Sequence, residues 1–218
     1  MALKLVIGNK NYSSWSMRPW LALRANDIAF EEIFIPLYTG EAGKKRILDV
    51  TRSGKVPVLI DDDVTIWDSL AIVEYLAERF PEKRLWPEDR AQRAHARSIS
   101  AEMHSGFAAL RNECGMNLHR PVSAIKPSAE ARADIARIQE IWSDCRARFS
   151  QSGPFLFGAF SGADAMFAPV VHRFRTYAIA VTPEVQRYMD AMMALPAFQE
   201  WTGAGLAETL VIDRFETA

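Results

Sequence analysis

The residues best suited to chemistry lie in a loop near the start of the chain. Tyr12, Ser13 and Ser14 directly precede a segment with helical spacing at 14–25. Serine is a preferred N-cap, so capping alone can account for these hydroxyls. A serine at a helix N-terminus can also stabilise an anion, because its hydroxyl and the positive end of the helix dipole act together. The loop therefore predicts either a plain cap or an anion site.

Two later dipeptides, Val56-Pro57 and Asp68-Ser69, also stand where strands begin or end. Proline at a strand entrance is typical of an edge, and a cis bond before Pro57 would turn the Val56 backbone toward an extended peptide. An ordinary trans proline is the alternative. Asp68 and Ser69 cap the next helix, but a helix start also binds a carboxylate, while Asp68 can receive an ammonium. A carboxylate and an ammonium on the same carbon are the main-chain groups of an amino acid, so the helix start could bind that end of a ligand.

Short strands and helices alternate over the first eighty residues. We expect these strands to form one mixed sheet with helices on its faces. The sheet would bring the two dipeptides close to the loop that holds Tyr12, Ser13 and Ser14, which we call the serine loop. Apolar runs and period-2 patterns predict strands at 3–8, 30–35, 56–60 and 65–67. Helical spacing predicts helices at 14–25, 41–50 and 69–80.

The second half of the chain carries helical patterns only. Two prolines and three charges at 80–87 indicate a boundary, so we expect one domain at 1–80 and an all-helical domain at 88–218. Helices are predicted at 88–118, 128–150 and 183–201. Between the last two, Ser161 and Asp164 have the spacing of an N-terminal capping box.

Composition narrows the classes of function. The 26 Lys and Arg against 27 Asp and Glu offer no general attraction to nucleic acid or to membranes. No apolar run is long enough to span a bilayer and the start lacks a secretory signal, so we expect an unprocessed, soluble protein. Cys114 and Cys145 are expected to be buried or semi-buried thiols in a reducing cytoplasm, with a single disulfide as the alternative. The four histidines lack metal-ligand spacing, which predicts no metal site.

The motifs resemble those of the cytosolic glutathione transferases, and the resemblance covers essentially the whole chain. Residues 13–18, SSWSMR, are similar to the SSCSWR motif of the zeta class, which includes maleylacetoacetate isomerases. Residues 55–81, KVPVLIDDDVTIWDSLAIVEYLAERFP, are similar to the family's glutathione-binding hairpin and helix. The resemblance implies a thioredoxin-like N-terminal domain, a helical-bundle C-terminal domain and glutathione as co-substrate.

The resemblance also implies roles for particular residues. Ser13 matches the serine that donates a hydrogen bond to the glutathione sulfur; Ser14 is the second candidate and Tyr12 the third. The glutathione-binding residues it implies are the backbone of Val56 beside cis Pro57, Asp68 and Ser69 at the γ-glutamyl end, and Lys55 near the glycyl carboxylate or a neighbouring oxygen. Trp15 replaces the motif's cysteine, which disfavours a mixed disulfide with glutathione.

The electrophile is expected between the domains. Trp15, His104, Phe107 and Arg111, together with Met116, could line an apolar pocket with one cation, or could be core residues and a solvated arginine. Arg173 and Arg175 lie near the position of a substrate-binding arginine in zeta enzymes.

The expected mechanism follows from thiol acidity. Lowering a thiol pKa from about 8.5 by about two units needs roughly 2.7 kcal/mol, which one charge-assisted hydrogen bond and a helix dipole supply. The resemblance thus implies a detoxifying glutathione transferase acting on a small electrophile, and a homodimer. The alternatives are a maleylacetoacetate-type isomerase or peroxidase, and a non-catalytic binding or regulatory protein of the same fold.

Overall fold

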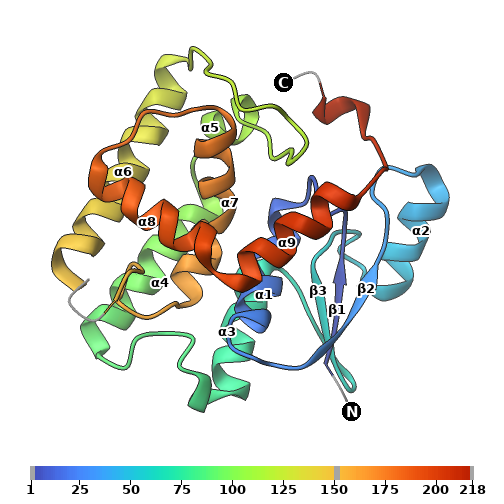
Figure 1. Cartoon of the computed structure of the whole chain (residues 1–218). Helices are drawn as coiled ribbons and strands as arrows, with labels where there is room; N and C mark the ends of the chain where they lie inside the picture. Colours follow the sequence, from blue (N-terminus) through green and yellow to red (C-terminus); the bar gives the residue numbers. More distant parts are fainter. Residues whose placement is uncertain (1–2, 150–152, 217–218) are drawn as a thin grey trace.

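The computed structural model describes residues 3–149 and 153–216 (Figure 1). Its first part is a four-stranded mixed sheet with three helices. The elements are β1 (Leu3–Ile7), α1 (Ser14–Arg24), β2 (Phe30–Phe34), α2 (Gly40–Val50), β3 (Val58–Asp61), β4 (Val64–Ile66) and α3 (Ser69–Arg79).

The sheet has the strand order β2-β1-β3-β4, with β1 parallel to β2 and the other pairs antiparallel. The central strand β1 is apolar on both faces. Leu5 and Ile7 point into a core shared with α1 and α3, whereas Val6 packs with Val58 and with Ile47 of α2. Successive side chains of β1 point to opposite faces of the sheet, and because both sets are apolar, helices cover both faces.

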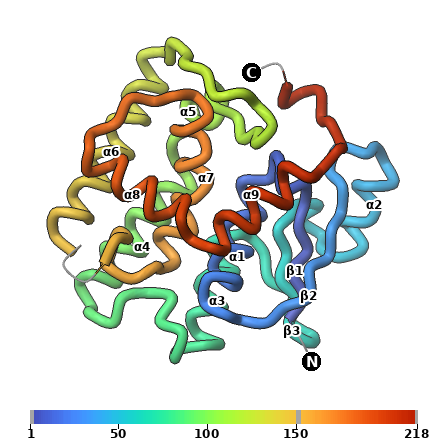
Figure 2. The backbone as a smooth tube through the Cα atoms, viewed as in Figure 1, coloured from blue at the N-terminus to red at the C-terminus, as the bar shows by residue number. Residues whose placement is uncertain are grey.

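The second part is helical. It contains α4 (Arg90–Ser105), α5 (Ala108–Glu113), α6 (Ala129–Phe149), α7 (Gly162–Thr176), α8 (Pro183–Ala194) and α9 (Pro196–Ala207), with short 3₁₀ turns η1 (Pro81–Lys83) and η3 (Asp213–Phe215). Helix α7 lies inside this domain (Figure 2), and Arg175 is its one residue that is not buried. The expected fold class, a thioredoxin-like domain followed by a helical bundle, is confirmed.

Two expected helices are each divided. The segment 88–118 breaks at Gly106 and Phe107, where Phe107 has a φ of 60° and α4 gives way to α5. The segment 183–201 breaks at Leu195, which is extended before Pro196. Apolar spacing continues through both breaks, so the pattern alone does not show them. Residue 150, the expected end of the helix predicted at 128–150, lies outside the described residues.

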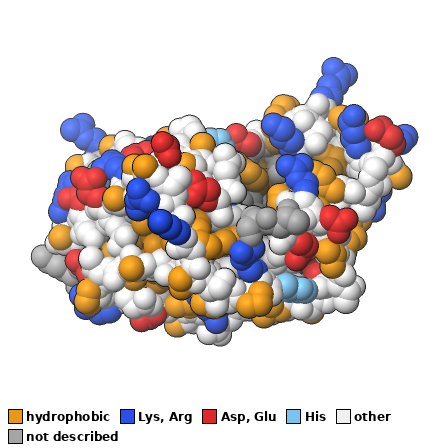
Figure 3. Space-filling model, turned by 90° about the horizontal axis from the view of Figure 1, so that it is seen from above, with side chains coloured by type: hydrophobic (Ala, Val, Ile, Leu, Met, Phe, Trp, Pro, Cys, Tyr) orange, Lys and Arg blue, Asp and Glu red, His pale blue; other side chains and the backbone are white. Residues whose placement is uncertain are grey.

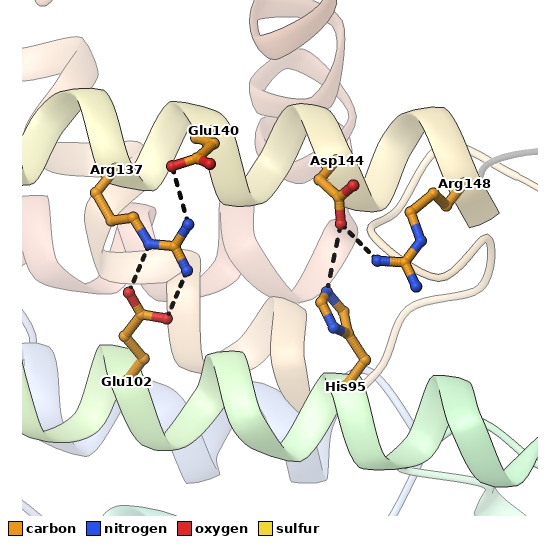
Figure 4. Close-up of polar contacts among 6 residues, drawn as sticks. All are labelled: His95, Glu102, Arg137, Glu140, Asp144 and Arg148. Atoms are coloured by element: carbon orange, nitrogen blue, oxygen red, sulfur yellow. Dashed lines mark hydrogen bonds and ion pairs between the residues drawn. The ribbon is translucent and has the colours of Figure 1, made fainter.

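Ion pairs join α4 and α6 on the outside of the helical domain (Figure 4). Arg137 binds Glu102 through Nε and Nη2, at 2.8 and 3.1 Å, and Glu140 through Nη1, at 2.9 Å. Asp144 accepts from Arg148 at 2.7 Å and lies 3.7 Å from the Nε2 atom of His95. These side chains are partly exposed and belong to the packing of the two helices.

The predicted capping box is present at the start of α7. Asp164 accepts hydrogen bonds from the backbone N–H of Ser161, from its hydroxyl and from the N–H of Leu156, at 2.8, 2.8 and 3.1 Å. Burial raises the pKa of Asp164 to about 6, against the effect of these donors. Helix α7 also packs on α1, so the box fixes the helix that connects the two domains.

No helix among the described residues has both the length and the apolar character needed to cross a membrane. The two cysteines are buried and free, as expected. Burial raises the pKa of Cys114 to about 11 and that of Cys145 to about 12, so neither is a reactive thiolate at neutral pH.

Candidate functional site

A cleft of about 1160 Å³ lies between the two domains. It is visible as a hollow with Lys and Arg side chains around it in Figure 3. The N-terminal domain contributes the α1 loop, the β2–α2 loop, the segment before β3 and the start of α3; the helical domain contributes α4, α5 and α7. The predicted site residues that line it are Ser13, Ser14, Trp15, Lys55, Val56, Pro57, Asp68, Ser69, His104 and Arg111.

Phe107 does not line this cleft. It is 7% exposed and packs in the hydrophobic core at the bend between α4 and α5. Of the two alternatives that the sequence left open for Phe107, its position is that of a core residue. Met116, by contrast, lines the cleft.

Ser13 is the N-cap of α1 and closes a chain of hydrogen bonds that begins in the sheet. The Gly8 N–H donates to Ser16 Oγ at 3.1 Å, and the Ser16 N–H donates to Ser13 Oγ at 3.3 Å. The two hydroxyl oxygens lie 2.8 Å apart. The first turn of α1 contains no acidic residue, so its positive end is not neutralised from within the helix.

The hydrogen bond between the Ser13 and Ser16 hydroxyls can reverse, because each hydroxyl both donates and accepts. Ser16 is fully buried, and its hydroxyl hydrogen has no acceptor except Ser13 Oγ among the described residues. A buried hydroxyl hydrogen is rarely left unpaired. In the structure Ser13 donates to Ser16; rotation of both hydroxyls reverses this bond, so that Ser16 donates to Ser13 and the Ser13 hydrogen becomes available to an acceptor in the cleft.

Ser14 is held by an arginine from the opposite domain. Arg173 of α7 donates through Nη2 to Ser14 Oγ at 3.3 Å and through Nη1 to the carbonyl oxygens of Cys114 and Arg111. Burial, and then the charge of Arg111, lower the pKa of Arg173 to about 10, so the guanidinium stays charged at neutral pH. The carbonyls at the end of α5 thus fix a cation beside the start of α1.

Two further arginines lie close to the ring of Trp15. The guanidinium carbons of Arg18 and Arg111 lie 4.3 and 4.8 Å from its ring centroid, and His104 meets the ring edge-on at 5.4 Å. Arg111 donates to the carbonyl oxygens of Gly106 and His104, at 3.0 and 3.2 Å. Stacking of this kind is favourable for guanidinium groups. Trp15 is 37% exposed and presents an aromatic surface to the cleft.

Arg18 is a residue that the sequence reasoning did not single out, although it ends the 13–18 motif. It is 1% exposed, donates to Ser69 Oγ at 3.5 Å, and its Nε has no partner among the described residues. Burial, and then the charges of Arg111 and Arg173, lower its pKa. Three mutually repelling guanidinium groups therefore surround the site, a concentration of positive charge that an anion would relieve.

Asp68 and Ser69 begin α3 at the opposite side of this cluster. One Asp68 oxygen accepts from the N–H groups of Leu70 and Ala71 at 3.0 and 3.4 Å, while the other lies 3.0 Å from His104 Nε2. The pairing joins α3 to α4 across the domains. Asp68 thus caps its helix and still presents a carboxylate at the cleft.

The wall between these two helix starts is the segment before β3. Val56 is half-buried, Pro57 is buried and Lys55 is exposed at the cleft. The Val56–Pro57 peptide bond is cis, the isomer that the resemblance implied; the bond before Asp68 is also cis. The structure therefore lines up the serine loop, this wall and the α3 start along one cleft.

Tyr12 also lines the cleft, but its hydroxyl is occupied. It donates to Glu216 Oε1 at 2.5 Å and accepts from the Ile212 N–H at 3.3 Å. Burial and then the bond to Glu216 raise the pKa of Tyr12. The third candidate for the thiol donor is thus engaged with the C-terminal segment.

Within residues 3–149 and 153–216, no three His, Cys, Asp or Glu side chains are grouped so as to hold a metal ion. His172 is buried on α7, 3.2 Å from Thr202 Oγ1 and stacked on Phe198. It is a core residue and does not reach the cleft.

Comparisons with known proteins agree with this architecture. The family model described as "Glutathione S-transferase, N-terminal domain" matches residues 12–79, and the model for the C-terminal domain of the same family matches 128–204. The maleylacetoacetate isomerase of Rattus norvegicus is 30% identical over 196 residues, which cover 85% of each chain. A probable maleylacetoacetate isomerase of Caenorhabditis elegans is 39% identical over 46% of each chain.

A solved glutathione transferase homologue from Burkholderia, with bound glutathione, superposes with a TM-score of 0.70. It is 24% identical, and the match covers 95% of this chain and 100% of that one, so this likeness is one of fold. The two family models together span more than half of the sequence, and the rat relative matches it along most of its length. The chain belongs to the glutathione S-transferase family.

Proposed function

We propose that the protein binds glutathione along the cleft and stabilises its thiolate with the Ser13 hydroxyl. The observation that carries this proposal is the position of the Ser13 hydroxyl: it lines the cleft, is bonded to Ser16, and caps a helix start whose first turn holds no acidic residue. Family membership supports glutathione as the ligand. The γ-glutamyl end would lie at Asp68 and Ser69, and the cysteinyl backbone would pair with Val56.

The free energy that these groups supply is sufficient to lower the pKa of the glutathione thiol. A charge-assisted hydrogen bond is worth roughly 1.5–3 kcal/mol, and a helix N-terminus adds roughly 0.3–1 kcal/mol. Lowering a thiol pKa by about two units requires about 2.7 kcal/mol. The nearby Arg173 adds a positive charge within the same cleft, which favours the thiolate further.

The electrophile would lie over Trp15, on the side of the helical domain. Arg111 and Arg173 line the cleft there, while the core position of Phe107 removes one expected apolar wall. This arrangement favours a small, flat electrophile that carries at least one carboxylate. Ser14, oriented by Arg173, is suited to bind the same acidic group rather than the sulfur.

Isomerisation of a conjugated acid is the second candidate function. The cationic half of the cleft suits a carboxylate-bearing alkene, and reversible addition of the thiolate would permit rotation about its former double bond. No atoms are gained or lost overall, because the thiolate leaves again and the double bond re-forms. Glutathione consumed in proportion to product indicates transfer, and unchanged glutathione with converted alkene indicates isomerisation.

The proposal is tested by calorimetry and turnover on two matched serine variants. Ser13→Ala should bind glutathione within a few-fold of wild type but turn over any electrophile about tenfold more slowly at pH 7. Ser14→Ala should keep the pKa of the bound thiol and raise KM for acidic electrophiles only. If the two variants showed each other's expected results, Ser14 would be the residue that donates a hydrogen bond to the glutathione sulfur. Wild-type protein that ignores millimolar glutathione would refute the proposal.

We also propose that the chain acts as a homodimer in the cytoplasm, in detoxification of small electrophiles. Family membership supports this part of the proposal. Light scattering of the purified protein should give twice the chain mass, and the mass of a single chain would contradict it.

A further inference from the structure

The chain does not end with α9 but returns to the N-terminal domain. Residues 208–216 run from the end of α9 toward the β2–α2 loop (Figure 1), and residues 210–214 face Leu37, Tyr38 and Thr39 across a small groove. Glu208 fixes the start of this segment, because its two oxygens accept from the N–H groups of Lys10 and Asn11 at 2.7 and 3.2 Å. We call residues 208–216 the C-terminal strap.

The far end of the C-terminal strap is fixed on Tyr12. Glu216 accepts from the Tyr12 hydroxyl at 2.5 Å and from Asn117 Nδ2 at 3.1 Å. The ring of Phe215 stacks on Tyr12 and meets Tyr38 edge-on, each at 5.5 Å between centroids. The strap is thus held at both ends by residues of, or beside, the serine loop, and it forms part of the cleft wall.

Between these anchors, Arg214 stands at the mouth of the cleft. Its guanidinium carbon lies 4.9 Å from the Tyr38 ring and 5.2 Å from the Phe215 ring. No carboxylate pairs with it among the described residues. Lys44 and Lys55 line the same end of the cleft, together with one acid, Glu41. Among the described residues that line this end, there are therefore three cations and one acid.

The orientation of bound glutathione, which rests on the proposed function, places a carboxylate of the ligand near these cations. With the γ-glutamyl end at Asp68 and the cysteinyl backbone at Val56, the tripeptide continues past Lys55 toward the β2–α2 loop. Its glycyl carboxylate then reaches the end that Lys44, Lys55 and the strap enclose. A guanidinium on a stacked aromatic shelf is preorganised for two parallel hydrogen bonds to a carboxylate.

We propose that Arg214 of the C-terminal strap binds the glycyl carboxylate of glutathione. The strap thereby makes the site selective for thiol peptides that end in a free carboxylate at this distance from the sulfur. Tyr12 has a positioning role in this account, because its hydroxyl holds the strap that carries Arg214.

The test compares glutathione with γ-glutamylcysteine, which lacks the glycyl residue, by calorimetry on the full-length protein. Arg214→Ala should weaken glutathione binding about five- to tenfold, between the effects of an exposed ion pair and of a charge-assisted hydrogen bond. Affinity for γ-glutamylcysteine should stay within twofold. Arg187→Ala removes an exposed arginine of α8 that lies away from the cleft and should change neither affinity.

Tyr12→Phe should lower the preference for glutathione in the same direction by a smaller factor. Arg214→Lys should recover part of that preference, because it restores the charge but not the fork of donors. Equal weakening of both ligands by Arg214→Ala, or no weakening of either, would overturn the role of Arg214 while leaving glutathione binding by wild type intact. Absence of binding to the wild-type protein would instead overturn the proposed function.

Discussion

Helices α1 and α7 pack against each other, and each begins with a buried serine, yet their N-termini are completed differently. At α7, Asp164 accepts three donors, including both polar hydrogens of Ser161. At α1, Ser13 receives the Ser16 N–H but no acidic residue occupies the first turn. One helix start is neutralised by the chain itself, and the other retains its positive end toward the cleft.

The difference separates a polar group that stabilises the fold from one that is available to a ligand. The partners of Asp164 are all internal, so its removal would be felt as lost stability. Beside Trp15, which follows the serines of the α1 loop, partners are incomplete: Arg18 Nε and His104 Nδ1 have none among the described residues. Incomplete pairing in a buried site is costly to the empty protein, and a bound anion would offset that cost.

Removal of the α7 acid should have the largest effect on stability. Asp164→Ala leaves the N–H groups of Leu156 and Ser161 without their acceptor inside the core. We expect a loss of about 3–5 kcal/mol in the free energy of unfolding, measured by urea denaturation. A loss below about 1 kcal/mol would show that the two helix starts do not differ as described.

The corresponding change at α1 should act on chemistry. Ser13→Ala should raise the pKa of bound glutathione by one to two units and cut turnover at pH 7 by about tenfold, since less thiolate is present. The loss of the cap should cost only about 1 kcal/mol of stability. Stopped-flow turnover and urea denaturation on one preparation measure both. Equal turnover in the variant would contradict the assignment.

His172 on α7 makes the stability of the protein depend on pH. Burial, and then the charge of Arg175, lower the pKa of His172 to about 3. Below about pH 6.5 the unfolded chain takes up a proton that folded His172 does not, so stability falls as the pH drops from 6.5 toward 3. Asp164, with its raised pKa, acts in the opposite sense between about pH 4 and 6.

His172→Gln removes the contribution of His172 to the pH dependence of stability and leaves that of Asp164. Its free energy of unfolding should fall with acid less steeply than that of wild type, by up to about 1.4 kcal/mol per pH unit. Urea denaturation at pH 6 and pH 4 gives this slope. Parallel slopes in the two proteins would show that His172 is protonated in the fold.

The surface ion pairs of α4 and α6 should matter least. Glu102→Gln breaks the paired contacts with Arg137, but both side chains are partly exposed to solvent. We expect a loss below about 1 kcal/mol that shrinks further in high salt. A larger loss would place these pairs with the α7 cap as elements that determine stability.

Much of this contrast can be predicted from the sequence. The apolar run at 3–8 predicted a strand, the order of elements predicted a mixed sheet with helices on its faces, and the spacing of Ser161 and Asp164 predicted the box. These signals are local. The order of strands and the pairing of β1 with β2 and β3 are also those of the fold class implied by the motifs.

The parts that the sequence did not predict depend on distant segments. Arg214 and Phe215 reach the cleft only because α9 ends beside the loop at Lys10 and Asn11. Arg173 was noted at the right place, but its contact with Ser14 spans 159 positions. The break at Leu195 did have a local signal, since a residue before proline is disfavoured in a helix.

The most direct test of the account is the ultraviolet difference titration of glutathione bound to the wild-type protein. It reports the thiolate itself, independently of which electrophile the enzyme uses. We predict a pKa between about 6 and 7 for the bound thiol, about two units below that of the free thiol. A bound thiol that titrates near about 8.5, as it does in solution, would contradict the claim that the start of α1, with Ser13 as its N-cap, stabilises the thiolate.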